Sequence, residues 1–227
     1  GRAGRKPGRD QRQLLCPGGR LHQNHPDRLA FEEIRHQAGY PGYFPAPDHQ
    51  RPKLADTTAC FQGFGNVAQH AVRLYSQLGG KVIAISCWDN DDKKSYTYRK
   101  MDGMNINELL DITDSFGTID KDKAKDLGYG ILPGEAWIEQ DVDILVPAAL
   151  ENQITAGNVH KISKQVKILT EAANGPTTPD ADVVMNERGI FILPDFLTNA
   201  GGVTCSYFEQ VQCNTNYFWE KKEVLEN

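Results

Sequence analysis

Residues 58–68, TACFQGFGNVA, decide the fold, because a short apolar run leads into a G-x-G-x-x-A turn that opens a helical pattern. In such a turn the first glycine permits a sharp bend, the second lets a pyrophosphate approach the backbone, and the alanine lets the helix pack against its strand. The start of the helix adds unpaired N–H groups and the positive end of its dipole. The stretch predicts a dinucleotide-binding site formed by Gly63, Phe64, Gly65, Asn66 and Val67.

The sequence after this turn has the order expected of a helix followed by a strand. Apolar residues recur at helical spacing from Val67 to Leu78, and Gly79 and Gly80 end the helix. Residues 81–86 form an apolar run typical of a buried parallel strand. A glycine-rich turn alone is a weak signal, since tight strand-to-helix connections are common. The complete unit favours dinucleotide binding over a plain strand-turn-helix.

The rest of the chain alternates strand and helix patterns. The predicted strands are 142–146, 166–169 and 190–193, and the predicted helices are 105–113, 121–128, 155–162, 179–187 and about 199–226. Strands separated by helices pair in parallel through right-handed crossovers. We therefore predict an α/β fold, with a doubly wound, Rossmann-like and mostly parallel sheet.

Composition narrows the class of protein. The chain has 227 residues, of which 39% are hydrophobic and 24% charged, as in a soluble globular protein. No apolar run is long enough to span a bilayer, so we expect a cytoplasmic protein without membrane contact. Five cysteines without a C-x-x-C pair predict neither a disulfide framework nor a metal site, and the net charge of -5 gives no reason to expect nucleic-acid binding.

The average charge hides a break near residue 56. Residues 1–56 hold 10 basic and 6 acidic residues, a net charge of +4, whereas residues 57–227 hold 15 and 24, a net charge of -9. Apart from a short helical pattern at 27–36, the first part has no sustained period, and we interpret it as an irregular, poorly structured segment that is not a native domain. Its alternatives are a phosphate-binding basic arm, a solvated tail, or a translation from a shifted frame or misjoined gene model.

Three segments that follow predicted strands carry a specific resemblance. They read PAALEN at 147–152, EAANGPTTP at 171–179 and PDFLTNAGGV at 194–203. In order and spacing, residues 57–227 resemble the cofactor domain of glutamate dehydrogenase, a member of the glutamate, leucine, phenylalanine and valine dehydrogenase family. The resemblance implies an NAD(P)-dependent oxidoreductase, commonly a homo-oligomer, that oxidatively deaminates L-glutamate to 2-oxoglutarate and ammonia.

The resemblance also implies roles for residues in these segments. Asn174 and Asn199 would contact the nicotinamide ribose of the cofactor, and Ala148 and Ala149 would line the floor beside it. From the residues alone, each segment is equally typical of turns and helix caps. Because all three follow parallel strands, they meet at the carboxyl edge of the sheet, where ligands of open α/β folds bind.

The segment at 201–206 would serve the substrate. By resemblance, Gly201 and Gly202 let the backbone approach it, and Val203 and Ser206 form the pocket for the glutamate side chain. Ser206 would donate a hydrogen bond to the γ-carboxylate. Without the family, Ser206 is as well explained as an exposed helix hydroxyl.

The adenosine end departs from the family. An acidic residue commonly ends the second strand there and holds the ribose hydroxyls, but the matching position in this chain is Cys87. We assign that role to Asp89, with Asp91 and Asp92 adding negative potential. No arginine lies close by and the first lysines come only after these acids, so the local field favours NAD over NADP.

No catalytic residue is identified. By resemblance, the catalytic lysine, the acid/base aspartate and the lysine for the substrate α-carboxylate belong to a separate N-terminal domain that residues 1–56 are too short to supply. Asp48 lies in a stretch with only a faint likeness to the aspartate motif. We expect a C-terminally truncated cofactor domain at 57–227 that is inactive alone. The alternative is a non-catalytic nucleotide-binding or regulatory module.

Overall fold

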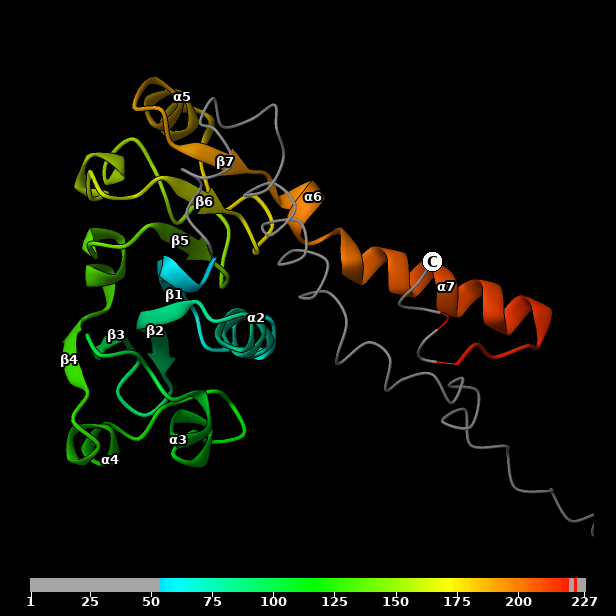
Figure 1. Cartoon of the computed structure of the whole chain (residues 1–227), viewed down its shortest axis with the longest axis horizontal. Helices are drawn as coiled ribbons and strands as arrows, with labels where there is room; N and C mark the ends of the chain where they lie inside the picture. The colour runs from blue at the N-terminus through cyan, green and yellow to red at the C-terminus, as the bar shows by residue number, and fades with distance from the viewer. Residues whose placement is uncertain (1–53, 221–222, 224–227) are drawn as a thin grey trace, which may run out of the picture.

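The structure, a computed structural model, describes residues 54–220 and residue 223. The predictions made for residues 1–53, including the helical pattern at 27–36 and Asp48, lie outside this range. Seven strands form one sheet in the order β4-β3-β2-β1-β5-β6-β7 (Figure 1). The strands are β1 (Thr58–Gln62), β2 (Lys81–Asp89), β3 (Lys94–Arg99), β4 (Gly130–Pro133), β5 (Ile144–Pro147), β6 (Ile168–Thr170) and β7 (Phe191–Leu193).

Helices connect the strands. The α-helices are α2 (Asn66–Gln77), α3 (Ile106–Asp111), α4 (Lys121–Asp126), α5 (Pro179–Glu187), α6 (Asp195–Thr198) and α7 (Ala200–Thr215), and the 3-10 turns are η4 (Leu54–Asp56), η5 (Gly134–Glu139) and η6 (Val159–Lys161). β1, β2, β5, β6 and β7 pair in parallel, while β3 and β4 are antiparallel. The prediction of an α/β fold with a mostly parallel, doubly wound sheet is confirmed.

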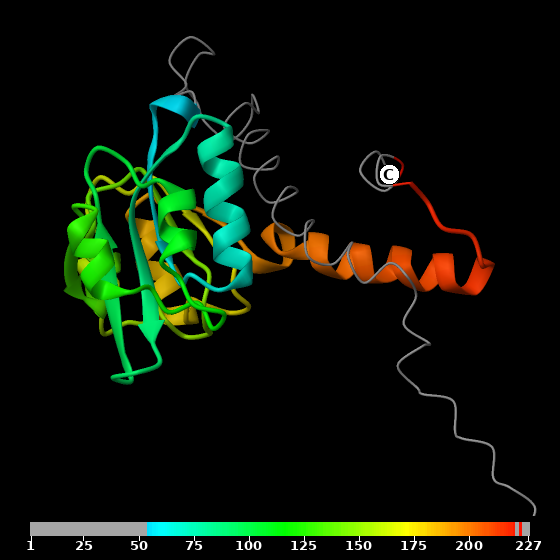
Figure 2. The same cartoon turned by 90° about the horizontal axis from the view of Figure 1, so that it is seen from below.

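Two apolar layers cover the two faces of the sheet. α2 and α3 pack on one face of the sheet (Figure 2). On this face Tyr75 meets Phe61 edge to face, with ring centroids 6.1 Å apart. On the other face, Met185 of α5 packs with Leu145 and Leu169 of the sheet. Both leucines are fully buried, and each contributes about 1.5–3 kcal/mol through burial. These two layers hold the carboxyl ends of the parallel strands at one edge.

Two strands were not predicted. β3 extends β2 as an antiparallel hairpin, with Asp89 opposite Lys94, and β4 pairs with β3. In β3, Lys94, Ser95 and Arg99 are exposed and Tyr96 is partly buried. β4 has only four residues. Neither strand therefore forms the continuous apolar run of a central strand. β4 is the edge strand here, and edge strands are half-solvated and give a weak pattern. β3 lies between β2 and β4, but its mixed exposure gives an equally weak pattern.

Two predicted helices were too long. Residues 155–162 form only the η6 turn, because Asn158 accepts a hydrogen bond from the Thr155 backbone N–H at 2.8 Å and donates to the Gln153 carbonyl oxygen at 2.8 Å. Such local bonds compete with a helix. α7 ends at Thr215, where Asn216 takes a left-handed conformation with φ of 52°, instead of continuing to about residue 226.

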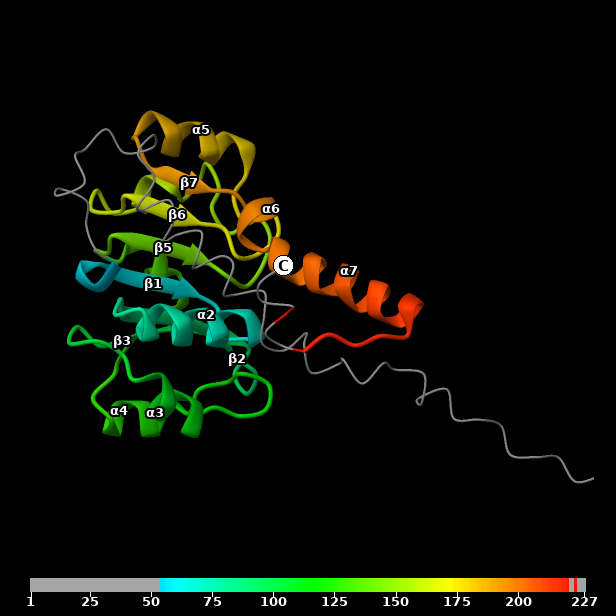
Figure 3. The ribbon, with the colours of Figure 1, turned by 45° about the vertical axis from the view of Figure 1, so that its right-hand side comes forward.

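α7 extends away from the edge of the sheet where β7 and α6 end, as both Figure 1 and Figure 3 show. In the part of the chain that the structure describes, no helix has the length and apolar character needed to cross a bilayer.

Candidate functional site at the carboxyl edge of the sheet

The two glycines of the turn after β1 have different reasons to be glycine. Gly63 has φ of +103°, and a Cβ there would lie 2.9 Å from the Cβ of Ala149. Gly65 has an ordinary φ of -76°, and within residues 54–220 no atom beyond its chain neighbours lies within 4 Å of where its Cβ would be. The fold therefore requires glycine at 63 but not at 65. The open space over Gly65 lies directly before α2, whose N-terminus has no side-chain cap.

Gln62 fixes this turn to the loop after β5. Its backbone oxygen accepts a hydrogen bond from Ala148 N–H at 2.8 Å, and its Oε1 accepts one from Ala149 N–H at 3.2 Å. Its Nε2 donates to Gln153 Oε1 at 3.0 Å. This role of Gln62 in positioning the turn was not predicted. Its only signal in the sequence is the location of Gln62 directly before Gly63.

Asn174 and Asn199 meet across two different loops. Asn199 Nδ2 donates to Asn174 Oδ1 at 2.6 Å. Next to this pair, Gly175 N–H donates to Asp195 Oδ2 at 2.8 Å. The loop after β6 and the loop between α6 and α7 are therefore held together at the two asparagines that the resemblance assigns to the ribose.

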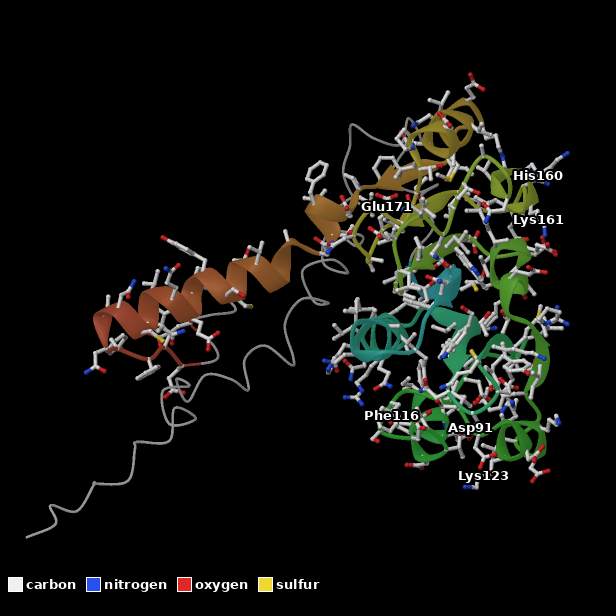
Figure 4. The ribbon with its side chains drawn as sticks, turned by 180° about the vertical axis from the view of Figure 1, so that it is seen from behind. Asp91, Phe116, Lys123, His160, Lys161 and Glu171 are labelled. Atoms are coloured by element: carbon white, nitrogen blue, oxygen red, sulfur yellow. The ribbon has the colours of Figure 1, made fainter. Side chains whose placement is uncertain are left out.

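Glu171 connects the same two loops, a role that was also not predicted. It is buried at the end of β6, and its Oε2 accepts a hydrogen bond from Asp195 N–H at 3.2 Å (Figure 4). Thr198 Oγ1 donates to its backbone oxygen. Burial raises the pKa of the Glu171 carboxyl above its usual range. This side chain holds the start of α6 in place, rather than facing the edge of the sheet.

A cavity of about 690 Å³, here called the edge pocket, lies between α2, the ends of β5 and β6, and the start of α7. It is bordered by Val67, Ala71, Val146, Ala148, Ala149, Leu150, Glu151, Thr170, Ala172, Ala173, Asn174, Thr198, Asn199, Gly202 and Val203. Apolar walls with a few convergent polar groups are typical of a small-molecule site.

The structure places half of the predicted site residues, six of twelve, on the wall of this pocket. Among its lining residues are both alanines of the predicted floor, both asparagines, Val67 and Val203. Gly63, Phe64 and Gly65 form the turn before α2, and Asn66 begins that helix, directly before the pocket residue Val67. Ser206 lies further along α7, where it is exposed and its Oγ donates to the Gly202 carbonyl oxygen at 3.2 Å.

At the predicted adenosine end, both carboxylate oxygens of Asp89 already have partners within the protein. Its Oδ1 accepts hydrogen bonds from the N–H groups of Asp91 at 2.8 Å and Asp92 at 3.3 Å. Its Oδ2 lies 2.7 Å from Lys121 Nζ. The carboxylate thus stabilises the turn between β2 and β3, and its contact with a ribose stays a prediction.

Lys121 is a basic residue close to these acids that was not included in the predicted local charge. Lys121 lies in the first turn of α4, and its Nζ is 2.7 Å from both Asp89 Oδ2 and Asp92 Oδ2. Three acids and one lysine therefore share this site, and the cluster keeps an excess of two negative charges. Cys87, at the position of the family acid, is buried, and burial raises its thiol pKa to about 11, so it stays uncharged at neutral pH.

The loop at 114–118 braces the glycine turn and was not predicted. Asp114 Oδ1 accepts hydrogen bonds from the N–H groups of Phe116 and Thr118, both at 2.8 Å. A Cβ on Gly117 would lie 3.2 Å from the Phe64 carbonyl oxygen, so this loop touches the turn. Figure 4 shows Phe116 and Asp91 at the same end of the molecule, and Phe116 is 81% exposed.

Replacing Lys121 by methionine is expected to lower the thermal midpoint at pH 7. Lys121 lowers the pKa of Asp89 in the fold, so the pair stabilises the protein above the unfolded carboxyl pKa of about 3.9, and this stability is lost as pH falls through the folded value. Thermal melts at pH 7 and pH 3 measure the effect, which shrinks at pH 3. Lys125→Met, at an exposed position of α4, is the control; an equal loss for Lys121→Met at both pH values contradicts this account.

Comparison with known proteins agrees with this geometry. A family model described as Glutamate/Leucine/Phenylalanine/Valine dehydrogenase matches residues 46–227. The catabolic NAD-specific glutamate dehydrogenase of Bacillus subtilis is 46% identical over 174 residues, which cover 77% of this chain and 38% of that protein. The NAD-specific glutamate dehydrogenase of Staphylococcus aureus is 44% identical over 182 residues, covering 80% and 41%.

A solved structure gives the same result. The crystal structure of glutamate dehydrogenase from Peptoniphilus asaccharolyticus superposes with a TM-score of 0.66 at 35% identity, covering 92% of this chain and 43% of that one. The chain thus spans about two-fifths of the length of the relatives it matches. Since the family model covers most of the chain, the protein belongs to the glutamate, leucine, phenylalanine and valine dehydrogenase family.

Proposed function

We propose that residues 57–227 form the cofactor domain of an enzyme that oxidatively deaminates L-glutamate to 2-oxoglutarate and ammonia and passes hydride to NAD. The names of the Bacillus subtilis and Staphylococcus aureus relatives, both NAD-specific glutamate dehydrogenases, support the substrate and the cofactor. The observation that carries the proposal is that Asn174 and Asn199 are hydrogen-bonded to each other on the wall of the edge pocket, which α2, the helix that Gly65 precedes, also borders. We place this activity in the cytoplasm, in a homo-oligomer.

The residues at this edge fit NAD. The pyrophosphate would lie over Gly65, where space is open and the N-terminus of α2 favours negative charge. The nicotinamide ribose hydroxyls would meet Asn174 and Asn199, with the ring against Ala148 and Ala149. When bound, NAD supplies the hydride acceptor, and the role of these residues is to orient it.

Two residues of α7 would select the substrate. Val203 and Ser206 are three positions apart, so they lie on one face of the helix. We assign the glutamate side chain to this face, with Ser206 Oγ donating to the γ-carboxylate. Its present bond to the Gly202 carbonyl is a local helix bond that a hydroxyl can exchange for a ligand.

NAD is expected to bind this chain at least about tenfold more tightly than NADP. A phosphate about 4 Å from one carboxylate experiences a gross repulsion of roughly 4 kcal/mol at an effective dielectric of about 20, and this cluster keeps an excess of negative charge even with Lys121 present. Calorimetric titration with both cofactors measures the ratio. Wild-type chain that binds NADP as tightly as NAD contradicts the assignment.

A charge-neutral variant locates the origin of this preference. Asp91→Asn removes an exposed carboxylate from the cluster. The variant should bind NADP more tightly, so the ratio of the NADP and NAD dissociation constants should fall. Asp102→Asn is the matched control, because Asp102 is also exposed but follows β3 at its opposite end. An unchanged ratio in Asp91→Asn assigns the discrimination to another part of the molecule.

A further inference from the structure

Among the residues that the structure describes, the hydroxyl of Thr170 is buried and has no hydrogen-bond partner. Thr170 is the last residue of β6, where it pairs with Leu193 of β7, and it is only 1% exposed. Within residues 54–220, no group forms a hydrogen bond with its Oγ1. Buried polar groups are nearly always paired, because an unpaired hydroxyl loses its bonds to water without replacement. An orphaned hydroxyl is therefore a reason to look for a ligand.

Thr170 lies on the wall of the edge pocket. Its neighbours on that wall include Val146 at the end of β5, Ala172 and Thr198. The hydroxyl of Thr198 already donates to the carbonyl oxygen of Glu171, whereas that of Thr170 is uncommitted. Asn174, which also borders the pocket, is by contrast exposed. Thr170 thus offers a polar group deep in a largely apolar part of the cavity.

Resting on the proposed function, we propose that Thr170 Oγ1 hydrogen-bonds to the carboxamide of the bound nicotinamide and so helps to select this ring. A flat aromatic ring suits walls such as Val146 and Ala172, and its carboxamide is the polar group that projects from it. A carboxamide carries both a donor and an acceptor, either of which a threonine hydroxyl can pair with. Asn174 and Asn199 are then left for the hydroxyls of the nicotinamide ribose.

Two variants of the full 227-residue chain test this role. Thr170→Val replaces the hydroxyl by a methyl group, and Thr170→Ser keeps the hydroxyl. The two ligands are NAD and ADP-ribose, which has the same ribose and phosphates but no nicotinamide. Calorimetric titration gives the dissociation constant for each pair, and thermal melts without ligand report on the fold.

Thr170→Val is expected to bind NAD about three- to tenfold more weakly, as for the loss of one neutral hydrogen bond, and to bind ADP-ribose as the wild type does. Its ligand-free thermal midpoint should not fall, because the variant removes an unpaired buried hydroxyl. Thr170→Ser should keep wild-type affinity for NAD. A role in packing alone would instead lower the thermal midpoint and affect both ligands.

The outcomes separate this inference from the proposed function. Wild-type chain that binds neither ligand overturns both. Wild-type chain that binds NAD, with Thr170→Val either unchanged or equally weakened toward NAD and ADP-ribose, overturns only the nicotinamide contact. Equal weakening assigns the hydroxyl to the ADP-ribose part that the two ligands share, and no change means that neither ligand uses it.

Discussion

Gly65→Val is expected to abolish NAD binding while leaving the fold intact. The φ of Gly65 is -76° and, in the part of the chain that the structure describes, no atom beyond its chain neighbours lies within 4 Å of its would-be Cβ, so valine fits the ligand-free protein. The branched side chain would occupy the space where the pyrophosphate must approach the backbone. We expect a loss of at least about a hundredfold in affinity, equivalent to about 2.7 kcal/mol, measured by calorimetry on protein with a wild-type circular dichroism spectrum.

Two further glycine variants separate binding from folding. Gly157→Val, at an exposed loop glycine without a positive φ, should leave both NAD affinity and stability unchanged. Gly63→Ala should destabilise the fold, since it places a Cβ 2.9 Å from Ala149 at φ of +103°. If folded Gly65→Val protein retains NAD affinity, the cofactor does not use this turn.

The purified 227-residue chain is expected to show no glutamate-dependent reduction of NAD. Among the residues that border the edge pocket, Glu151 is the one ionisable side chain, and none is a lysine. Proton transfer by a positioned group contributes about 10²–10⁴-fold, and substrate orientation contributes more. By resemblance, the groups for both lie in a separate domain. Absorbance at the NADH band, with saturating glutamate and NAD, measures the rate.

A fusion provides the positive control for this negative result. Residues 57–227 joined behind the N-terminal domain of the Bacillus subtilis relative, in place of the matching segment, should recover glutamate-dependent turnover. The same fusion carrying Gly65→Val should not. Turnover by the unfused chain would mean that residues 1–56 contribute the missing chemistry after all.

The central part of the fold could be predicted from sequence because its signals are local. The run at 81–86 is apolar throughout, as a strand buried on both faces must be, and α2 places Ala68, Ala71, Val72 and Tyr75 on one buried stripe. β4 has four residues and none is buried, so its pairing with β3 is visible only in three dimensions. The length of η6 was decided by side-chain bonds that an apolar pattern does not contain.

The candidate site also has a part that could be predicted from the sequence and a part that could not. Its loops were predictable because each follows a parallel strand and therefore reaches the same edge. Its supporting residues were not, since their partners are remote in sequence: Gln62 bonds to a residue 91 positions away, Lys121 to one 29 positions away, and Glu171 to one 24 positions away. The prediction for the Asp89 cluster lacked Lys121 for this reason, because that lysine belongs to α4, which is remote in sequence, although the sign of the predicted charge stays negative.

The most direct measurement of the central claim is the titration of NAD into isotopically labelled chain, followed by the chemical shifts of assigned backbone amides. The account predicts that the largest shifts cluster at residues 63–68, 148–149, 172–175 and 198–203, the segments that form or adjoin the edge pocket. The amides of α5, on the opposite face of the sheet, should stay nearly unchanged. Shifts that cluster elsewhere, or no shifts at millimolar NAD, would contradict the account.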